Sequence, residues 1–536
     1  MRYRPIVRHL LTLAAFLALF VALTLPNRLE WIAPPAFIFF PLEFMLIGLL
    51  LLLPGPLGKA SLVLTAVLLG LSILLRVADL VTFEIFARPF NLMFDSHLLA
   101  DGSRLLTGVL GDLAAVLIAL ALVLASACVC YLAFVLLRRI QRALRAVPRL
   151  SAAAMSLLVV AWVAVTAAGW PRANHFALDQ LRAHVLHTVE SIADIRRFAE
   201  VVNEDPWSSR SQEALLSRLR GKDVFIVFAE SYGRVLLERE PFREPVISTL
   251  TRAEERLSAN GFISRSAFLD SPTVGGLSWL AHASVLSGAW IDSETRYKTL
   301  MLSERTTLNR LFRNAGWRTV AAMPAISMAW PEGQYYGYDH IYNAHNFGYQ
   351  GLPYNWVTMP DQYVLSALQA RERSDAERPP LMAEVALISS HAPWTPIAEL
   401  VPWDQVDDGR IFNAQAVSGP APEVVWRDPE RIRYHYRRSI EYMIETLVSY
   451  VLEYGDEDLV IVLMGDHPAA PLVSGDTDSK QVPVHLISRD QEVIDAITGW
   501  RWQPGMLPDT EAPVWRMDAF RDRFVSAFSE PQAAGE

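Results

Sequence analysis

Residues with metal-ligating or acid-base side chains follow three apolar runs in the second half of the sequence. Glu230 comes directly after one run, the adjacent pair Asp466 and His467 after another, and His391 shortly after a third. Carboxylate oxygens together with an imidazole nitrogen suit Zn²⁺ or Mn²⁺, with Mg²⁺ as a further alternative. An imidazole such as that of His391 can serve acid-base chemistry or contact substrate oxygens. A polar residue must follow any buried strand, but three separate loops have no structural reason to carry ligand-type residues.

A nucleophile candidate, Ser278, follows the paired glycines Gly275 and Gly276. Glycines allow a close backbone approach, and a helical stretch beginning at Ser278 would present its N-terminal amides to a phosphate. Coordination to a metal would lower the pKa of the hydroxyl and make it an attacking group. A structural reading makes Ser278 the N-cap of that helix, which is compatible with catalysis. Thr273 and Ser284 are weaker nucleophile candidates.

The elements that must hold these residues are predicted to form a mainly parallel sheet covered by helices on both faces. Strands separated by helix-length segments are typical of that α/β arrangement. Ligands collect beyond the carboxyl ends of such strands, where the polar residues above are expected to meet. The predicted strands are Val224–Ala229, Arg318–Ala322, Val385–Ser389, Leu459–Met464 and Val482–Ile487.

The N-terminal part of the sequence predicts a bundle of five transmembrane helices. Each apolar run is long enough, or nearly so, to cross ~30 Å of hydrocarbon. The runs are 10–26, 31–53, 60–82, 113–137 and 152–170. The predicted domains are a transmembrane domain over 1–170, with an interfacial segment at about 83–111, a helical connector over 171–221, and an exported catalytic domain over 222–530.

Charge predicts the orientation of these helices. Nine basic residues lie before the first helix or in the loops on its side, whereas the opposite loops hold three, and positive loops stay in the cytoplasm. An odd number of crossings then places the catalytic domain outside, periplasmic or extracellular, on the inner (plasma) membrane. A cleaved signal peptide is the alternative for the first run, but the small-residue cleavage pattern is missing. Because the part after the helices is acidic, nucleic acid is not expected as a partner.

The motifs, taken in order, resemble the alkaline phosphatase and sulfatase superfamily, and within it the branch of lipoteichoic acid synthases and phosphoethanolamine transferases. The similarity covers about residues 220–490. It implies an alkaline-phosphatase-like α/β/α domain and a metal held by Glu230, Ser278, Asp466 and His467. Ser278 stands where the branch usually has a threonine nucleophile. His391 matches a family histidine that contacts substrate phosphate and protonates the leaving group.

Three features differ from the family pattern. Besides serine in place of threonine, the synthases grip glycerol phosphate with a Trp-x-Arg segment, whereas this chain has Trp330 and Glu332. One hypothesis is that Glu332 faces a cationic headgroup such as ethanolamine while Trp330 supplies a cation-π surface. The alternative is that Glu332 is a solvated loop residue. The third difference concerns cysteines: exported phosphoethanolamine transferases that act on lipid A usually have disulfides, and both cysteines here, Cys128 and Cys130, lie in the fourth apolar run.

The predicted reaction moves a phosphoglycerol or phosphoethanolamine group from a membrane phospholipid to a hydroxyl acceptor of the envelope, a glycan or a lipid, through a phospho-serine intermediate. The scaffold also suits an exported phosphodiesterase or phosphatase, because water can replace the acceptor. A non-catalytic envelope scaffold is the third hypothesis.

Overall fold

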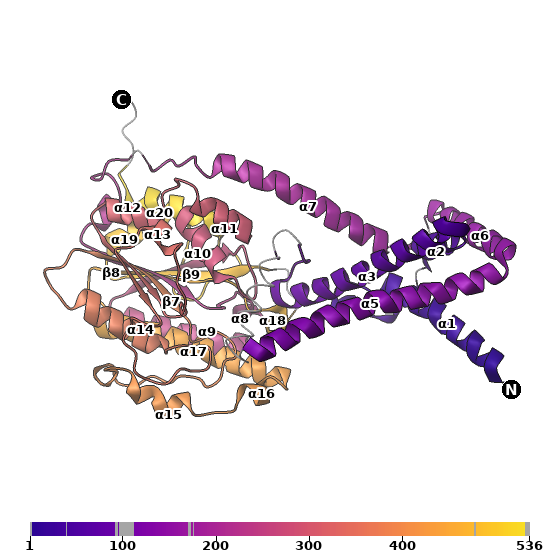
Figure 1. Ribbon diagram of the computed structural model, residues 1–536. Coiled ribbons are helices and arrows are strands. Elements are labelled where there is room, and N and C mark those ends of the chain that lie inside the picture. Colours follow the sequence, from indigo (N-terminus) through magenta and orange to yellow (C-terminus); the bar gives the residue numbers. More distant parts are fainter. Residues whose placement is uncertain are drawn as a thin grey trace. The chain divides into compact units, whose positions relative to one another are not determined.

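The computed structural model of the protein describes residues 3–38, 40–91, 95, 112–169, 173–174, 176–208, 210–475 and 479–530. The chain divides into two compact units, drawn in Figure 1. The first comprises Met1–Glu84 and Arg88–Asp194, and the second comprises Ile85–Ala87 and Ile195–Glu536. The division falls within a long helix, α7 (Phe176–Val201), in the region predicted as a connector. The predicted domain boundaries stay a prediction.

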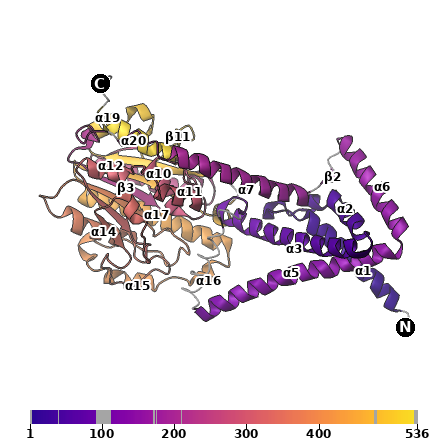
Figure 2. The same cartoon turned by 45° about the horizontal axis from the view of Figure 1, so that its top comes forward.

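The first unit is a set of apolar helices, and among its described residues four helices are long and apolar enough to cross a membrane. In lipid a helix satisfies its own backbone hydrogen bonds, which favours this structure for long apolar runs. Figure 2 shows α6 leaving the end of α5 at an angle, where Pro148 is the first residue of α6. The four helices are α1 (Tyr3–Thr24), α3 (Gly55–Phe86), α5 (Asp112–Ala146) and α6 (Pro148–Ala167).

The predicted count of five spanning helices is not confirmed. The run 31–53 begins at the last residue of a 3₁₀ helix, η1 (Leu29–Trp31). It contains a second 3₁₀ helix, η2 (Pro34–Phe37), a short strand, β1 (Phe40–Pro41), and the helix α2 (Leu42–Leu51). The α2 helix has 10 residues and so a length of about 15 Å, half of the hydrocarbon thickness. Pro34, Pro35 and Pro41 break the run, because proline interrupts a continuing helix. Most of the predicted interfacial segment, 83–111, lies outside the described residues.

In the described part of the second unit the strands form a nine-stranded mixed sheet, most of which is parallel. The strand order is β10-β4-β9-β8-β3-β7-β5-β6, and β11 pairs with β4. All neighbouring pairs from β8 to β6 are parallel, whereas β9 runs antiparallel to both β8 and β4. The strands are β3 (Asp223–Ala229), β4 (Ile263–Asp270), β5 (Arg318–Met323), β6 (His340–Asn343), β7 (Leu381–Leu387), β8 (Leu459–Gly465), β9 (Gln481–Ser488), β10 (Gln503–Pro504) and β11 (Val514–Arg516).

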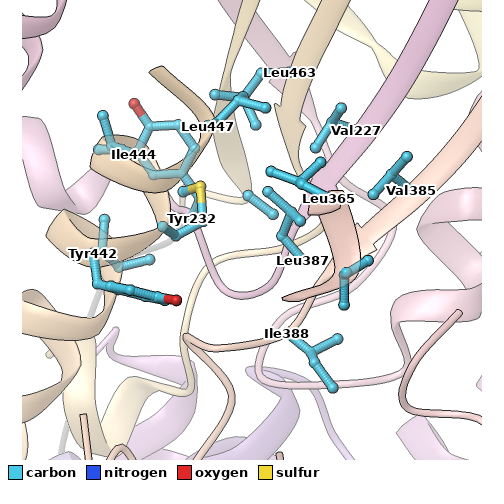
Figure 3. Close-up of a cluster of buried hydrophobic side chains, with 14 of the residues drawn as sticks. Val227, Tyr232, Leu365, Val385, Leu387, Ile388, Tyr442, Ile444, Leu447 and Leu463 are labelled. Carbon is cyan, nitrogen blue, oxygen red and sulfur yellow. The ribbon is translucent and has the colours of Figure 1, made fainter. Parts of the chain in front are cut away.

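Helices cover both faces of this sheet. Alternate residues of each strand point to opposite sides, and here both sets enter apolar cores that the helices complete. Phe225 and Val227 of β3 enter one apolar core, and Ile226 and Phe228 enter the other. Figure 3 shows part of the first core, where Val227 and Val385 lie near side chains of the covering helices. That face carries α8 (Val235–Glu238), α9 (Arg243–Ala259), α14 (Asp361–Leu368) and α17 (Pro429–Tyr454). The other carries α10 (Ser278–Ser287), α11 (Glu294–Met301), α12 (Leu308–Asn314), α19 (Gln491–Ala496) and α20 (Phe520–Phe528).

The five predicted strands correspond to β3, β5, β7, β8 and β9. Strand β7 begins at Leu381, four residues before its predicted start. The prediction started too late because the buried Glu384 interrupts the apolar pattern of the strand. Strand β4 was not predicted, since the buried Ser264 and Ser266 make it look like a polar loop. The α/β fold with helices on both faces is therefore observed, with an antiparallel β9 that strand composition does not reveal.

Candidate metal centre

Glu230, Asp466 and His467 lie together at the carboxyl ends of β3 and β8. One ligand atom from each of the three side chains lies within 4.8 Å of the other two. The register of the two parallel strands causes this meeting, since Ala229 pairs with Gly465 and the next residues are Glu230 and Asp466. The Asp466 amide continues the ladder by donating to the Ala229 carbonyl at 3.2 Å.

The Asp466 carboxylate is held by backbone amides. Its Oδ1 accepts hydrogen bonds from the amides of Ser231 at 2.8 Å and His467 at 2.6 Å. The Ser231 amide can reach it because Ser231 adopts a left-handed conformation, with φ of 59°, directly after Glu230. The remaining oxygen, Oδ2, lies 3.7 Å from His467 Nε2. One oxygen is therefore fixed by the backbone, and the other faces the centre.

The ring of His467 is oriented as a metal ligand. Its Nδ1 lies 2.9 Å from the Pro468 carbonyl, which can only accept, so Nδ1 carries the proton. The lone pair of the neutral ring is then on Nε2, which lies 3.4 Å from Glu230 Oε1. A second hydrogen bond that fixes the tautomer in this way is typical of metal-bound histidine.

The hydroxyl of Ser278 joins this group. Ser278 Oγ lies 3.3 Å from Glu230 Oε2 and 3.2 Å from His467 Nε2. The prediction that Ser278 is an N-cap is wrong: Leu277 occupies that position with φ of 64°, and Ser278 is the first helical residue of α10. Its hydroxyl faces the carboxylate of Glu230 and makes no capping hydrogen bond.

The other two nucleophile candidates have local structural roles. Thr273 Oγ1 donates to the Gly276 carbonyl at 2.7 Å. Ser284 Oγ donates to the Leu280 carbonyl and accepts from the Ile291 amide, and the residue is fully buried. Of the three hydroxyls, the structure brings that of Ser278 to the carboxylates.

The ionisation of the centre reflects two buried carboxylates side by side. Burial and the charge of Glu230 raise the pKa of Asp466 to about 6. Burial opposes protonation of His467, but Asp466 and Glu230 outweigh it and raise its pKa. Burial also opposes ionisation of Glu230, whose pKa is nevertheless lowered by the charges of His467 and His391. Two buried carboxylates without a paired cation are costly, and a divalent ion would supply the missing positive charge. Three oxygen donors and one imidazole nitrogen fit Zn²⁺ or Mn²⁺.

His391 lies beside this group on an exposed loop after β7. Its Nδ1 donates to the Ala392 carbonyl at 2.6 Å, which leaves Nε2 as the edge available to a substrate. The hydroxyl of the preceding Ser390 donates to the backbone carbonyl of Glu230 at 2.6 Å and ties the loop to the centre. His391 is thus near enough for its charge to act on Glu230, but it is not part of the ligand group.

Trp330 and Glu332 lie in the segment before α13 (Gly333–Tyr336), outside the ligand group. The Trp330 ring packs against Tyr336 and Tyr338, with centroids 5.7 and 6.3 Å apart. Glu332 is exposed. Their substrate-binding role stays a prediction.

Sequence reasoning missed two polar residues that hydrogen-bond to each other, His282 and Glu384. His282 lies one helical turn after Ser278, and its Nδ1 is 2.7 Å from Glu384 Oε1. Two signals were present: the spacing of four residues from Ser278, and a lone carboxylate within the apolar strand 381–387.

The fold and the site together define an α/β/α domain with a candidate divalent-metal centre that includes a serine hydroxyl, attached to apolar helices that can span a membrane. No protein-family model and no curated protein matches the chain.

Solved structures do match. The integral membrane lipooligosaccharide phosphoethanolamine transferase A of Neisseria meningitidis is 12% identical over 96% of this chain and 95% of that chain, with a TM-score of 0.45. The lipoteichoic acid synthase LtaP of Listeria monocytogenes is 15% identical over 61% of this chain and 76% of that chain, with a TM-score of 0.37. The Streptococcus pyogenes phosphoglycerol transferase GacH is 12% identical over 64% and 82%, with a TM-score of 0.37. Two of these structures are named for the activities of the branch that the motifs resemble, a lipoteichoic acid synthase and a phosphoethanolamine transferase.

Proposed function

We propose that this protein is a membrane-anchored, metal-dependent phosphotransferase. It moves a phosphoglycerol or phosphoethanolamine group from a membrane phospholipid to a hydroxyl acceptor, a glycan or lipid of the cell envelope. The observation that carries the proposal is the position of Ser278 Oγ, 3.3 Å from Glu230 Oε2 and 3.2 Å from His467 Nε2. A hydroxyl at these distances lies within the group of side chains that could bind a divalent ion.

Glu230, Asp466, His467 and Ser278 would hold the ion, which when bound lowers the pKa of the hydroxyl and offsets charge on the phosphate. The Ser278 oxygen then attacks the phosphorus of the donor's phosphodiester. The bond from phosphorus to the diacylglycerol oxygen breaks, and His391 protonates that oxygen as it leaves. In the second step the acceptor hydroxyl attacks the same phosphorus, gives its proton to His391, and the bond to Ser278 breaks.

The apolar helices support a lipid donor, because tethering raises the effective concentration of a domain near the bilayer. The basic loops favour a cytoplasmic N-terminus and an exterior catalytic domain on the plasma membrane. That placement needs an odd number of crossings, so in this proposal the segment holding η1, η2 and α2 makes a crossing besides the four long helices. The second unit has no cysteine. A single cysteine introduced there, and labelled in intact cells by an impermeant reagent, tests the placement.

The activity test uses the full chain in phospholipid vesicles with Mn²⁺ or Zn²⁺ and measures release of diacylglycerol. Ser278→Ala should reduce the rate of diacylglycerol release at least about 10³-fold, as removal of a nucleophile does. The control Ser284→Ala should still release diacylglycerol through Ser278. Wild-type turnover in Ser278→Ala would refute the proposal. Release of free headgroup phosphate even with acceptor hydroxyls present would identify a hydrolase instead.

A further inference from the structure

A second polar cluster lies one turn along the helix that carries Ser278. His282 of α10 places Nδ1 2.7 Å from Oε1 of Glu384 in β7. The ring of His282 stacks on Phe228 of β3, with centroids 3.7 Å apart and planes 16° apart. Glu384 is 1% exposed within a strand that is otherwise apolar. Burying a carboxylate in this position costs free energy of folding unless the group is fully hydrogen-bonded. The hydrogen-bond partners of Glu384 therefore show what the carboxylate holds in place.

Three donors converge on Glu384. They are His282 Nδ1, the hydroxyl of Tyr338, and Asn309 Nδ2 at 3.4 Å from Oε2. Because a carboxylate oxygen accepts hydrogen bonds, Nδ1 of His282 is assigned the proton of its contact with Glu384. The stacking and the hydrogen bond together fix the ring. The structure gives Nε2 no hydrogen-bond partner among the described residues, and the side chain keeps 13% of its surface exposed.

The fixed ring lies beside the metal centre. His282 follows Ser278 by four residues on α10, a spacing that places both side chains on one helix face. Phe228, on which the ring stacks, precedes Glu230 by two residues on β3. The positive charge of His282 is also close enough to lower the pKa of Asp466, against the larger effects of burial and of Glu230. A helix turn, a strand and a charge interaction thus place His282 at the edge of the centre.

We propose that His282 binds the transferred phosphate, with its Nε2–H donating to a non-bridging phosphate oxygen. The inference rests on the proposed function and names a phosphate contact that the motifs did not predict. Glu230 and Asp466 repel an anion, so the phosphate needs donors on the side away from the ion. A histidine ring held by a carboxylate on one nitrogen, with an N–H on the other directed at a phosphate oxygen, is such a donor. No bond is made or broken at His282.

Glu384 and Tyr338 act as positioning residues. Tyr338 packs against Trp330 and Tyr336, with centroids 6.3 and 5.9 Å apart. Tyr338 therefore contacts both the ring of Trp330, which is predicted to bind the headgroup, and the carboxylate that holds His282. A change at Tyr338 should weaken phosphate binding less than a change at His282, because it removes one of three donors to Glu384.

The test compares two variants of His282 in the full, metal-loaded chain. An asparagine places an amide near the position of Nδ1 and can keep the Glu384 hydrogen bond, but it removes Nε2. A glutamine can reach the position of Nε2. The probe is inorganic phosphate, whose binding is measured by calorimetry and by competition with the phospholipid donor, and bound metal is measured by mass spectrometry. The exposed His340 on the edge strand β6 gives a control, His340→Ala.

We expect His282→Asn to weaken phosphate binding at least about tenfold, the loss expected for one charge-assisted hydrogen bond. His282→Gln should recover part of that loss, Tyr338→Phe should lose less than His282→Asn, and metal content should stay at the wild-type value in all of them. Phosphate affinity within twofold of wild type in His282→Asn would overturn the inference. Loss of metal in that variant would also overturn it, because His282 would then be a metal ligand.

The proposed function can fail separately. A wild-type chain that binds phosphate through His282 but transfers no headgroup would contradict the transferase proposal alone. A chain that needs Ser278 for transfer but binds phosphate equally well without His282 would contradict the inference alone.

Discussion

The acidic groups at the two ends of strand β3 differ in their charged partners. At the amino end, Asp223 is 4% exposed in its side chain and accepts from Arg373 Nε at 2.8 Å and from Arg378 Nη1 at 2.7 Å. Burial opposes its ionisation, but the two guanidinium groups lower its pKa. At the carboxyl end, Glu230 and Asp466 have His467 as partner, and no ion pair with arginine or lysine occurs there among the described residues.

This contrast separates a structural charge from a functional one. Buried acids that stabilise a fold are paired with cations of the chain itself, because an unpaired buried charge is costly. Among the described residues, His467 is the partner within ion-pair distance of both acids, and one histidine leaves negative charge that a bound ion can balance. Substitutions at each end of β3 can therefore test the distinction.

The largest effect is expected at the carboxyl end. Asp466→Asn removes a ligand, so bound metal should be lost and headgroup transfer should fall at least about 10³-fold. Chelation should lower the melting temperature of the wild type and leave that of the variant unchanged, because an ion bound only to the folded state stabilises it. Metal analysis and paired melts measure this. Asp458→Asn, at the exposed amino end of β8, is the control. A variant that keeps its metal would show that Asp466 is not a ligand.

At the amino end the effect should be on stability. Asp223→Ala leaves Arg373 buried without its main partner, which should cost about 3–5 kcal/mol in the free energy of unfolding. Denaturant unfolding measures the loss, and the metal content of the folded variant should not change. If Asp223→Ala instead removed the metal without destabilising the chain, the contrast between the two ends would be wrong.

A third buried acid, Asp361, gives a pH test. Burial raises its pKa to about 7, although it accepts a hydrogen bond from the Ser389 amide at 2.9 Å. Because the folded pKa lies above the unfolded value, the folded state binds more protons, and stability falls as pH rises from about 4 to 7. Asp361→Asn should remove a penalty of at most a few kcal/mol above pH 7. Melting temperatures at pH 5 and pH 8 should converge in the variant, and an unchanged slope would contradict this assignment.

The smallest effect is expected at Glu332, which is exposed and outside the ligand group. If its charge selects a cationic headgroup, Glu332→Gln should lower the preference for phosphatidylethanolamine over phosphatidylglycerol by a few-fold, about 1 kcal/mol or less. Competition between the two donors measures this preference. An unchanged preference would remove Glu332 from headgroup recognition.

The sequence predicted those parts of the site that follow directly from strand ends. Glu230 and Asp466 each follow an uninterrupted apolar strand, and parallel pairing of β3 with β8 brings them together. The direction of β9 could not be predicted, since a fully buried strand has the same composition in either orientation.

Other features depend on partners that are distant in the sequence. The role of Glu384 depends on its hydrogen-bond partners His282, Asn309 and Tyr338, which come from three other segments. The length of α2 was overestimated because hydropathy alone does not register the prolines that precede it. The hydroxyl of Ser278 was predicted to cap its helix, and only the structure shows that Leu277 occupies the cap.

In the proposed function, one divalent ion and the Ser278 hydroxyl form a single reactive centre. Mass spectrometry of the full chain incubated with mixed phospholipids tests it most directly, with and without chelator. We expect a phosphoglycerol or phosphoethanolamine mass added to the peptide containing Ser278, present with metal and absent with chelator. An adduct at another residue, or turnover in wild type without any adduct, would contradict it.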